Sequence, residues 1–124
     1  MAANRTPPPS SGGAEDPSRS SATDTIEIVD DDGRATVIVR GDLDAVTAPE
    51  LRATLLAVIE RAPTTLRVDL AAVEFLDSAG ISVLVVGHKR SSDNGVAFEL
   101  AAVPEPSRRV LELTRLTDVF TIID

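Results

Sequence analysis

The chain has 124 residues, 43% of them apolar and 26% charged, which fits one small globular domain with a single core. It contains no cysteine, and this excludes a disulfide scaffold, a thiolate zinc site and thiol catalysis. Twelve basic and twenty acidic residues give a net charge of −8, which disfavours nucleic acid and anionic lipid as partners.

Residues 1–24 differ in composition from the rest of the chain. They contain no Val, Ile, Leu or Phe and are rich in proline, serine and glycine, so they cannot bury enough apolar surface to fold. We predict a disordered tail over residues 1–24 and one folded domain over residues 25–124. The tail has no apolar segment of the secretory type, and the longest uncharged stretch of the domain, residues 78–87, is about half as long as a membrane-crossing helix. The expected location is therefore the cytoplasm, without direct membrane contact.

The first elements of the domain are predicted to be a hairpin and a helix. Residues 26–29 and 35–39 have the pattern of strands, and the Asp-Asp-Gly sequence between them is typical of a turn. Thr47 and Glu50 have the spacing of a capping box, in which each side chain covers a free backbone amide, and the proline between them suits a first helical turn. A helix is expected to begin there and to end before Pro63.

The rest of the domain is predicted to alternate strands with helices. In chain order these are a strand over residues 66–70, a connection through Val73, Phe75 and Leu76, a helix over 78–92, a strand over 96–101, a helix over 106–116 and a short strand over 120–123. Strands that alternate with helices after an opening hairpin indicate an α/β fold with a mixed sheet of four to five strands and helices packed on it.

The common motifs of enzyme chemistry are absent from the sequence. It has no P-loop, no GxGxxG turn, no GxSxG elbow and no HExxH helix. The single histidine, His88, has no second histidine or cysteine with which to share a metal, and we assign it a packing or surface role. The sequence therefore predicts no metal, no cofactor and no enzyme activity.

Residues 73–81 form an apolar segment that leads into Asp77-Ser78 at the start of a predicted helix. Ser78 is expected in the first turn, beside backbone amides that have no partner within the helix. A phosphate on Ser78 would meet the positive end of the helix dipole and accept hydrogen bonds from those amides, and the small Ala79 and Gly80 would leave room for it. The alternative is that Ser78 is only an N-cap and that Gly80 lets the helix pack closely on the sheet.

A second acidic segment, residues 41–44, follows the second predicted strand, and the topology can bring it near Ser78. Carboxylates beside a serine can orient its hydroxyl or coordinate magnesium during phosphoryl transfer. The alternative is that these aspartates only form a turn. The two interpretations differ in whether Asp44 and Ser78 meet in space.

Several short motifs follow one another along the chain: residues 41–44 with Thr47, residues 68–70, residues 75–80, and residues 113–116 with Phe120. In this order and spacing they resemble the STAS domain, in particular the small bacterial anti-sigma-factor antagonists, and the resemblance spans residues 25–123. It implies that Ser78 is phosphorylated by a partner that is both anti-sigma factor and serine kinase. It also implies that the unmodified protein binds this partner and frees a sigma factor, and that a serine phosphatase reverses the modification.

The resemblance also implies roles for the residues around the phosphoacceptor. The partner-binding set carried over by position is Asp44, Thr47, Asp77, Ser78, Ala79 and Gly80. Asp44 and Asp77 would help to position the hydroxyl, whereas ATP and magnesium would come with the kinase. The chain itself would be a substrate and a binding protein, with no cofactor or metal of its own.

Three departures from the family pattern carry expectations. Ala79 stands where many relatives have a second hydroxyl residue, which leaves Ser78 as the acceptor in the motif. Arg115 stands where relatives often have glycine, and because arginine tolerates a positive φ poorly, the third helix is expected to end differently. The sequence ends at Asp124, whereas many relatives continue into a final helix. An uncovered apolar face would favour self-association, so the sequence leaves both a monomer and a homodimer as alternatives.

Two functions compete with the leading prediction of an anti-sigma-factor antagonist switched at Ser78. One is a phosphorylation-independent STAS scaffold or accessory subunit of a transport or signalling complex, in which Ser78 is only an N-cap. The other is a small enzyme with Asp44 and Asp77 as an acid and base pair, for which the sequence offers no recognisable substrate pocket or nucleophile.

Overall fold

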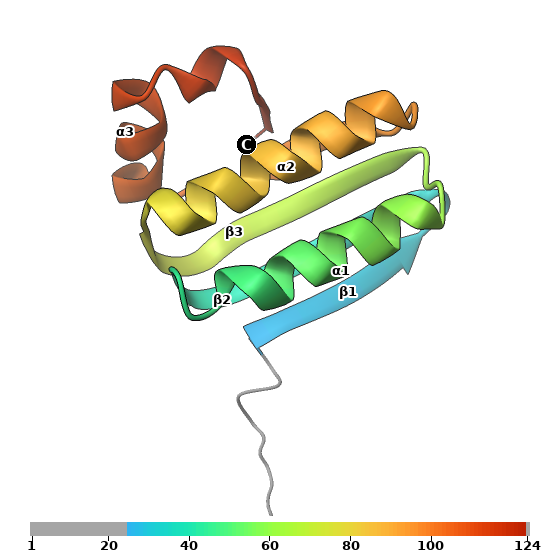
Figure 1. The fold of residues 1–124 in the computed structure, drawn as a ribbon, viewed down its shortest axis with the longest axis horizontal. Helices are drawn as coiled ribbons and strands as arrows, with labels where there is room; N and C mark the ends of the chain where they lie inside the picture. The colour runs from blue at the N-terminus through green and yellow to red at the C-terminus, as the bar shows by residue number, and fades with distance from the viewer. Residues whose placement is uncertain (1–24, 124) are drawn as a thin grey trace, which may run out of the picture.

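The core of the protein is a five-stranded sheet, described by a computed structural model of residues 25–123 (Figure 1). The predicted tail of residues 1–24 lies outside the described residues. The strands are β1 (Ile26–Asp31), β2 (Arg34–Leu43), β3 (Thr65–Leu76), β4 (Ala97–Ala101) and β5 (Thr121–Ile123), and their order in the sheet is their order in the chain. β1 pairs with β2 antiparallel, and the other neighbouring strands pair in parallel. The predicted mixed sheet with an opening hairpin is confirmed.

The opening hairpin turns at Asp32 and Gly33, whose φ angles are 52° and 85°. Asp31 pairs with Arg34 across the turn, so only these two residues form the loop. Two successive positive φ angles are typical of a type I′ turn, whose twist matches that of the flanking strands. An Asp-Gly sequence suits this turn because both residue types enter the left-handed region at low cost.

Two long helices cover one face of the sheet. α1 (Ala48–Glu60) and α2 (Ser78–Asp93) lie side by side over the sheet, and α3 (Glu105–Leu113) stands apart from them at one end (Figure 1). Val37 and Val68 of the central strands are fully buried and belong to one cluster with Leu51 of α1 and Leu84 of α2. Burial of each such side chain contributes about 1.5–3 kcal/mol to the free energy of unfolding. Within residues 25–123, no helix is both long and apolar enough to cross a membrane.

The third strand is longer than the sequence predicts. Val73, Phe75 and Leu76 belong to β3, so the connection predicted through them is wrong. The parallel register with β2 shifts twice, between Ile38 and Arg40 and again further on, and each shift marks a bulge or irregularity. The alternation of buried and exposed residues is lost in this half of β3. Because the second half of β3 has no alternation of period two in its sequence, the pattern predicts a loop there.

The third helix is also shorter than the predicted span of residues 106–116. α3 ends at Leu113, and a single 3-10 turn follows at Leu116–Asp118. Between them Arg115 adopts the left-handed conformation, with φ 63° and ψ 23°. The expectation that arginine would prevent a left-handed residue after the third helix is therefore wrong. Arg115 takes the conformation that glycine favours, at a cost of about 1–2 kcal/mol in backbone strain.

Candidate functional site

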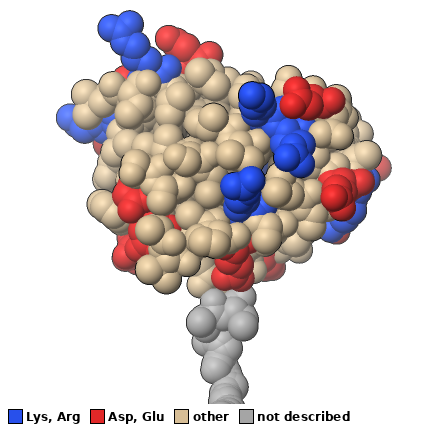
Figure 2. Space-filling model, in the orientation of Figure 1, with Lys and Arg blue, Asp and Glu red and all other residues tan. Residues whose placement is uncertain are grey.

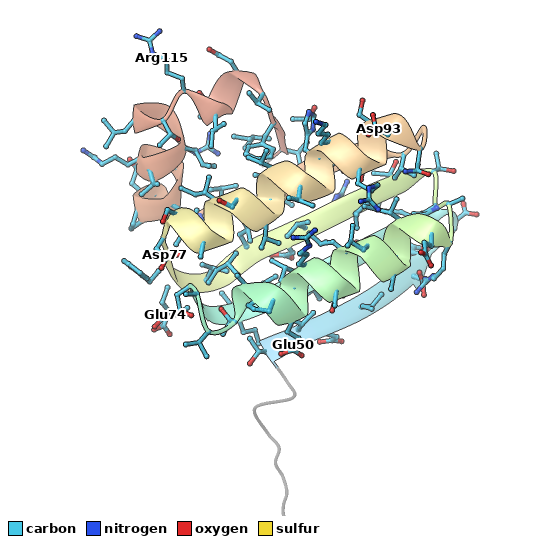
Figure 3. All side chains as sticks on the ribbon, viewed as in Figure 1. Glu50, Glu74, Asp77, Asp93 and Arg115 are labelled. Atoms are coloured by element: carbon cyan, nitrogen blue, oxygen red, sulfur yellow. The ribbon has the colours of Figure 1, made fainter. Side chains whose placement is uncertain are left out.

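The candidate site lies where β2 and β3 end at the same edge of the sheet. Leu43 and Leu76 are paired in register, and the N–H of Asp77 donates to the carbonyl oxygen of Leu43 at 3.2 Å. Asp44 and Asp77 each follow the last residue of their strand, so the structure brings the two acidic segments together. Figure 3 shows Asp77 at this edge, where α2 begins.

Asp77, and not Ser78, is the N-cap of α2. One carboxylate oxygen, Oδ1, accepts hydrogen bonds from the N–H groups of Ala79 at 2.9 Å and Gly80 at 3.2 Å. Ser78 is the first residue of the helix and its side chain is exposed. The alternative in which Ser78 caps the helix is therefore wrong, whereas its predicted place in the first turn is confirmed. Because Asp77 already uses the two amides, the prediction that they are free to bind a phosphate is wrong as well.

Replacement of Asp77 by alanine is expected to lower the free energy of unfolding by about 1 kcal/mol, because two amides at the start of α2 lose their acceptor. Asp77→Asn keeps an acceptor oxygen and should retain most of the stability. Urea unfolding followed by circular dichroism measures the effect, with Asp42→Ala as the control because Asp42 is an exposed acid in the same edge. Equal stabilities of Asp77→Ala and Asp42→Ala would contradict the cap.

Gly80 is a point of close approach between α2 and the sheet. A Cβ atom at this position would lie 2.6 Å from the carbonyl oxygen of Leu43, 2.7 Å from Leu43 Cγ and 2.8 Å from Leu76 Cδ1. Real Cβ atoms are not found so close to backbone oxygen, so only glycine fits. The prediction that Gly80 leaves room for a phosphate is wrong, because the packing of the helix fills that space. The other interpretation, close packing of helix on sheet, is confirmed.

Thr47 and Asp44 form the turn between β2 and α1, and they do so without a capping box. The Thr47 hydroxyl donates to the carbonyl oxygen of Asp42 at 2.8 Å and accepts from the N–H of Asp44 at 3.0 Å. Thr47 makes no cap hydrogen bond to the helix, because its backbone is already helical, with φ −94° and ψ −20°. The predicted capping box of Thr47 with Glu50 is therefore wrong.

The carboxylate of Asp44 takes over the role that the capping box was expected to fill. Its Oδ1 atom accepts hydrogen bonds from the N–H groups of Val46 at 3.0 Å and Thr47 at 3.2 Å. The turn-forming interpretation of Asp44 is confirmed. Within residues 25–123, no hydrogen bond joins the Ser78 hydroxyl to either Asp44 or Asp77. The site is thus an exposed hydroxyl at an edge of the sheet that also carries two carboxylates, each of which is held by two backbone amides.

Sequence reasoning missed two exposed apolar side chains at the same edge. Val46 lies in the turn that Asp44 closes and is 86% exposed, and Phe75, next to the last residue of β3, is 54% exposed. A valine and a phenylalanine in an α/β sequence are ordinarily assigned to the core, so nothing in the pattern distinguished them. Phe75 lies on β3 with buried Leu76 beside it, so its ring faces away from the core.

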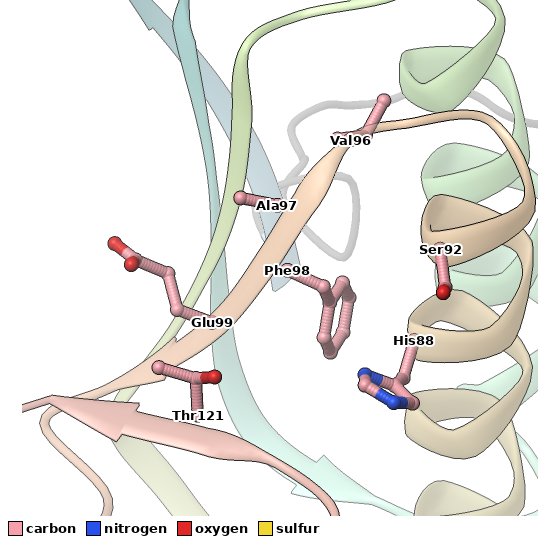
Figure 4. A pocket seen from close by; sticks show the side chains of 7 residues that line it. All are labelled: His88, Ser92, Val96, Ala97, Phe98, Glu99 and Thr121. Carbon is pink, nitrogen blue, oxygen red and sulfur yellow. The ribbon is translucent and has the colours of Figure 1, made fainter.

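The single histidine lies far along α2, away from this edge. The His88 ring packs edge-on against Phe98 and Phe120, with ring centroids 6.0 Å and 5.8 Å away. It borders a cavity of about 240 Å³ between α2 and β4, which Ser92 and Thr121 also line (Figure 4). The packing role assigned to His88 is confirmed. Among the described residues, no group of three His, Cys, Asp or Glu side chains could hold a metal ion.

These features define an α/β binding domain that presents one polar edge. The chain belongs to the STAS domain family, whose model matches residues 25–124. The resemblance predicted from the sequence motifs is confirmed.

The chain is similar to several anti-sigma factor antagonists. The anti-sigma-F factor antagonist RsfB of Mycobacterium tuberculosis is 32% identical over 98 residues, which cover 79% of this chain and 80% of RsfB. An anti-sigma-B factor antagonist of Bacillus subtilis is 28% identical over 97 residues, covering 78% of this chain and 88% of the relative. The crystal structure of an anti-sigma factor antagonist from Mycobacterium paratuberculosis has a TM-score of 0.73 and 36% identity, covering 79% of this chain and 83% of that one.

Each of these relatives is named as an anti-sigma factor antagonist, which agrees with the prediction that this chain is not an enzyme. The geometry agrees with that assignment. Asp44 and Asp77 each hold two backbone amides at a turn or a helix start, a structural task that leaves the acid and base pair of the enzyme alternative without support.

Proposed function

We propose that this protein is an anti-sigma-factor antagonist controlled by phosphorylation of Ser78. In the unmodified state it binds an anti-sigma factor that has serine kinase activity, and the sigma factor is thereby freed. When the partner phosphorylates Ser78, the complex separates, and a serine phosphatase restores the binding form. The partner contact includes Asp44, Thr47, Asp77, Ser78 and Ala79, and the buried Gly80 contributes to it by fixing the start of α2.

The observation that carries this proposal is the position of Ser78. Its side chain is exposed at the first turn of α2, and the turn is fixed from both sides. The Asp77 carboxylate holds the two following amides, and Gly80 lies against Leu43 and Leu76. A rigid and exposed hydroxyl is suited to a kinase, since the acceptor needs no local unfolding to reach the nucleotide.

The release step has a simple physical basis at this edge. A phosphoserine adds about −1.5 to −2 charge at neutral pH, and it would be placed beside the carboxylates of Asp77 and Asp44. Burial of that charge in an interface adds a desolvation cost. A penalty of about 3 kcal/mol weakens binding more than a hundredfold.

The partners supply what the chain lacks. ATP and magnesium would be bound by the kinase, so the chain itself needs no cofactor. Kinase, sigma factor and phosphatase act together in the cytoplasm, and the proposal places this chain there with them.

The proposal is tested by a pull-down from native lysate, with the wild type, Ser78→Ala and Ser78→Asp as baits and bound proteins identified by mass spectrometry. We expect a small ATP-binding serine kinase with the wild type and with Ser78→Ala, and its loss with Ser78→Asp, whose carboxylate adds charge at the contact. Circular dichroism of each bait checks that the variants are folded.

Retention of one partner by all three baits would contradict the switch. If that partner were a membrane or signalling protein, the scaffold function would replace the antagonist function. Absence of any anti-sigma factor from the wild-type bait would contradict the antagonist function itself.

A further inference from the structure

We propose that Val46 and Phe75 are the apolar anchors of the partner contact, and that the partner meets them with an apolar pocket bordered by lysine or arginine side chains. This inference rests on the proposed function, because it describes the surface of the anti-sigma factor that binds at the Ser78 edge. It adds two residues to the contact and a chemical description of the partner.

Both side chains are exposed although the protein has a core to bury them in. Val46 is 86% and Phe75 54% exposed, whereas Leu43 and Leu76, beside them in the chain or the sheet, are buried. The other large apolar residues that are exposed lie on β1 or beyond the start of α3, namely Ile28, Val29, Leu113 and Val119. An aromatic ring kept in water next to a functional group is typical of an interface, where such rings bury the most area.

The two side chains lie at the same edge of the sheet. Phe75 is paired in register with Asp42 on the neighbouring strand. The carbonyl oxygen of Asp42 accepts the Thr47 hydroxyl, which folds the turn that carries Val46 back over the end of β2. Neighbouring strands lie about 5 Å apart, so Phe75 and the turn that carries Val46 lie at the adjoining ends of β3 and β2.

The backbone that carries Val46 and Phe75 is held in place before any partner binds. The N–H of Val46 donates to Asp44 Oδ1 at 3.0 Å, and Phe75 lies in a paired strand. A fixed anchor loses little conformational entropy on binding, and more of its contact energy therefore appears as affinity.

The charge around the anchors describes the partner. Residues 41–47, 71–81 and 102–106, which lead from the ends of β2, β3 and β4, contain several acids and no lysine or arginine. The acids are Asp42, Asp44, Glu74 and Asp77, together with Glu105, whose carboxylate lies 3.6 Å from the Arg109 guanidinium. Figure 2 shows acidic side chains at the lower left of the molecule, in the region where Figure 3 labels Glu74 and Asp77. A partner that matches this edge needs cationic side chains around an apolar pocket, and such matching steers association and selects the partner.

The test uses the anti-sigma factor that the wild-type bait retains, purified and titrated by isothermal calorimetry. We expect Val46→Ser and Phe75→Ser each to weaken binding by about tenfold or more, as loss of a buried anchor does. Leu113→Ser is the matched control, because Leu113 is 78% exposed but lies at the end of α3, and its affinity should equal that of the wild type. All three sites of change are exposed, and thermal melts verify folding.

The charge of the partner is tested separately with Glu74→Gln combined with Asp42→Asn. We expect this double variant to bind more weakly at low salt and to match the wild type at high salt, because screening removes the attraction that it lacks. Wild-type affinity in both anchor variants would overturn the inference while the antagonist function still stood. A gain in affinity of the double variant would overturn the cationic border. Failure of the wild type to bind any anti-sigma factor would overturn the proposed function and this inference together.

Discussion

Replacement of Gly80 by alanine is expected to lower the free energy of unfolding by about 3 kcal/mol, the upper range for an overpacked core site. The added methyl group would lie 2.6 Å from the carbonyl oxygen of Leu43, which is backbone and cannot rotate away. Alanine favours a helix over glycine by about 1 kcal/mol, so the steric cost must exceed that gain. For a domain of this size, a loss of 3 kcal/mol corresponds to a fall in Tm of about 15 °C.

Gly87→Ala is the matched control for this prediction, because it lies in the same helix. There the nearest atoms are Leu55 Cδ1 at 2.9 Å and Phe98 Cε1 at 3.0 Å, both at the far ends of side chains that can shift. We expect its Tm to fall by much less than that of Gly80→Ala in calorimetry. If the order of the two variants were reversed, Gly80 would not be the point at which α2 is fixed to the sheet.

Phosphate transfer from labelled ATP is expected to be lost completely in Ser78→Ala and to be unchanged in Ser82→Ala. The two serines lie one turn apart on α2 and both are exposed, so exposure alone does not separate them. The Ser82 hydroxyl donates to the carbonyl oxygen of Ser78 at 2.9 Å and lies one turn into the helix, whereas Ser78 is the first residue of the helix. The measurement is incorporation of phosphate with the anti-sigma factor from the pull-down, ATP and magnesium.

Phosphopeptide mapping of the wild type identifies the modified serine independently of the variants. Incorporation that survives in Ser78→Ala and disappears in Ser82→Ala would move the acceptor one turn along the helix. Incorporation that survives in both would place it elsewhere in the chain, and the switch proposed at Ser78 would then fall.

The fold could be predicted from the sequence wherever a segment keeps a single period. The alternation in β2 and the three- and four-residue spacing in α1 each report one buried face, so the hairpin, the helices and the mixed sheet were predicted correctly. Prediction failed where the backbone leaves its regular form. The shifted register of β3 hides the second half of that strand, and the left-handed residue Arg115 ends α3 earlier than its composition suggests.

The candidate site was predictable in its place but not in its hydrogen bonds. The motif located Ser78 at the start of a helix, and the topology joined it to the segment of Asp44. Which side chain caps which amide depends on backbone angles that the sequence does not reveal: Thr47 matches a capping box in sequence but is already helical in its backbone. The exposure of Val46 and Phe75 could not be predicted, since an apolar residue is assigned to the core until the bounds of the neighbouring strands are known.

The two amides held by the Asp77 carboxylate bear on how fast the protein can change state. A phosphate on Ser78 finds those two donors taken, so it could bind them only by displacing the Asp77 carboxylate. The modified and unmodified domains are then expected to share one backbone conformation and to differ only in the charge and shape of the surface at Ser78. No slow refolding step then separates the modified and unmodified domains. The response time of the switch is set by the turnover of the kinase and the phosphatase, and the domain itself adds no delay.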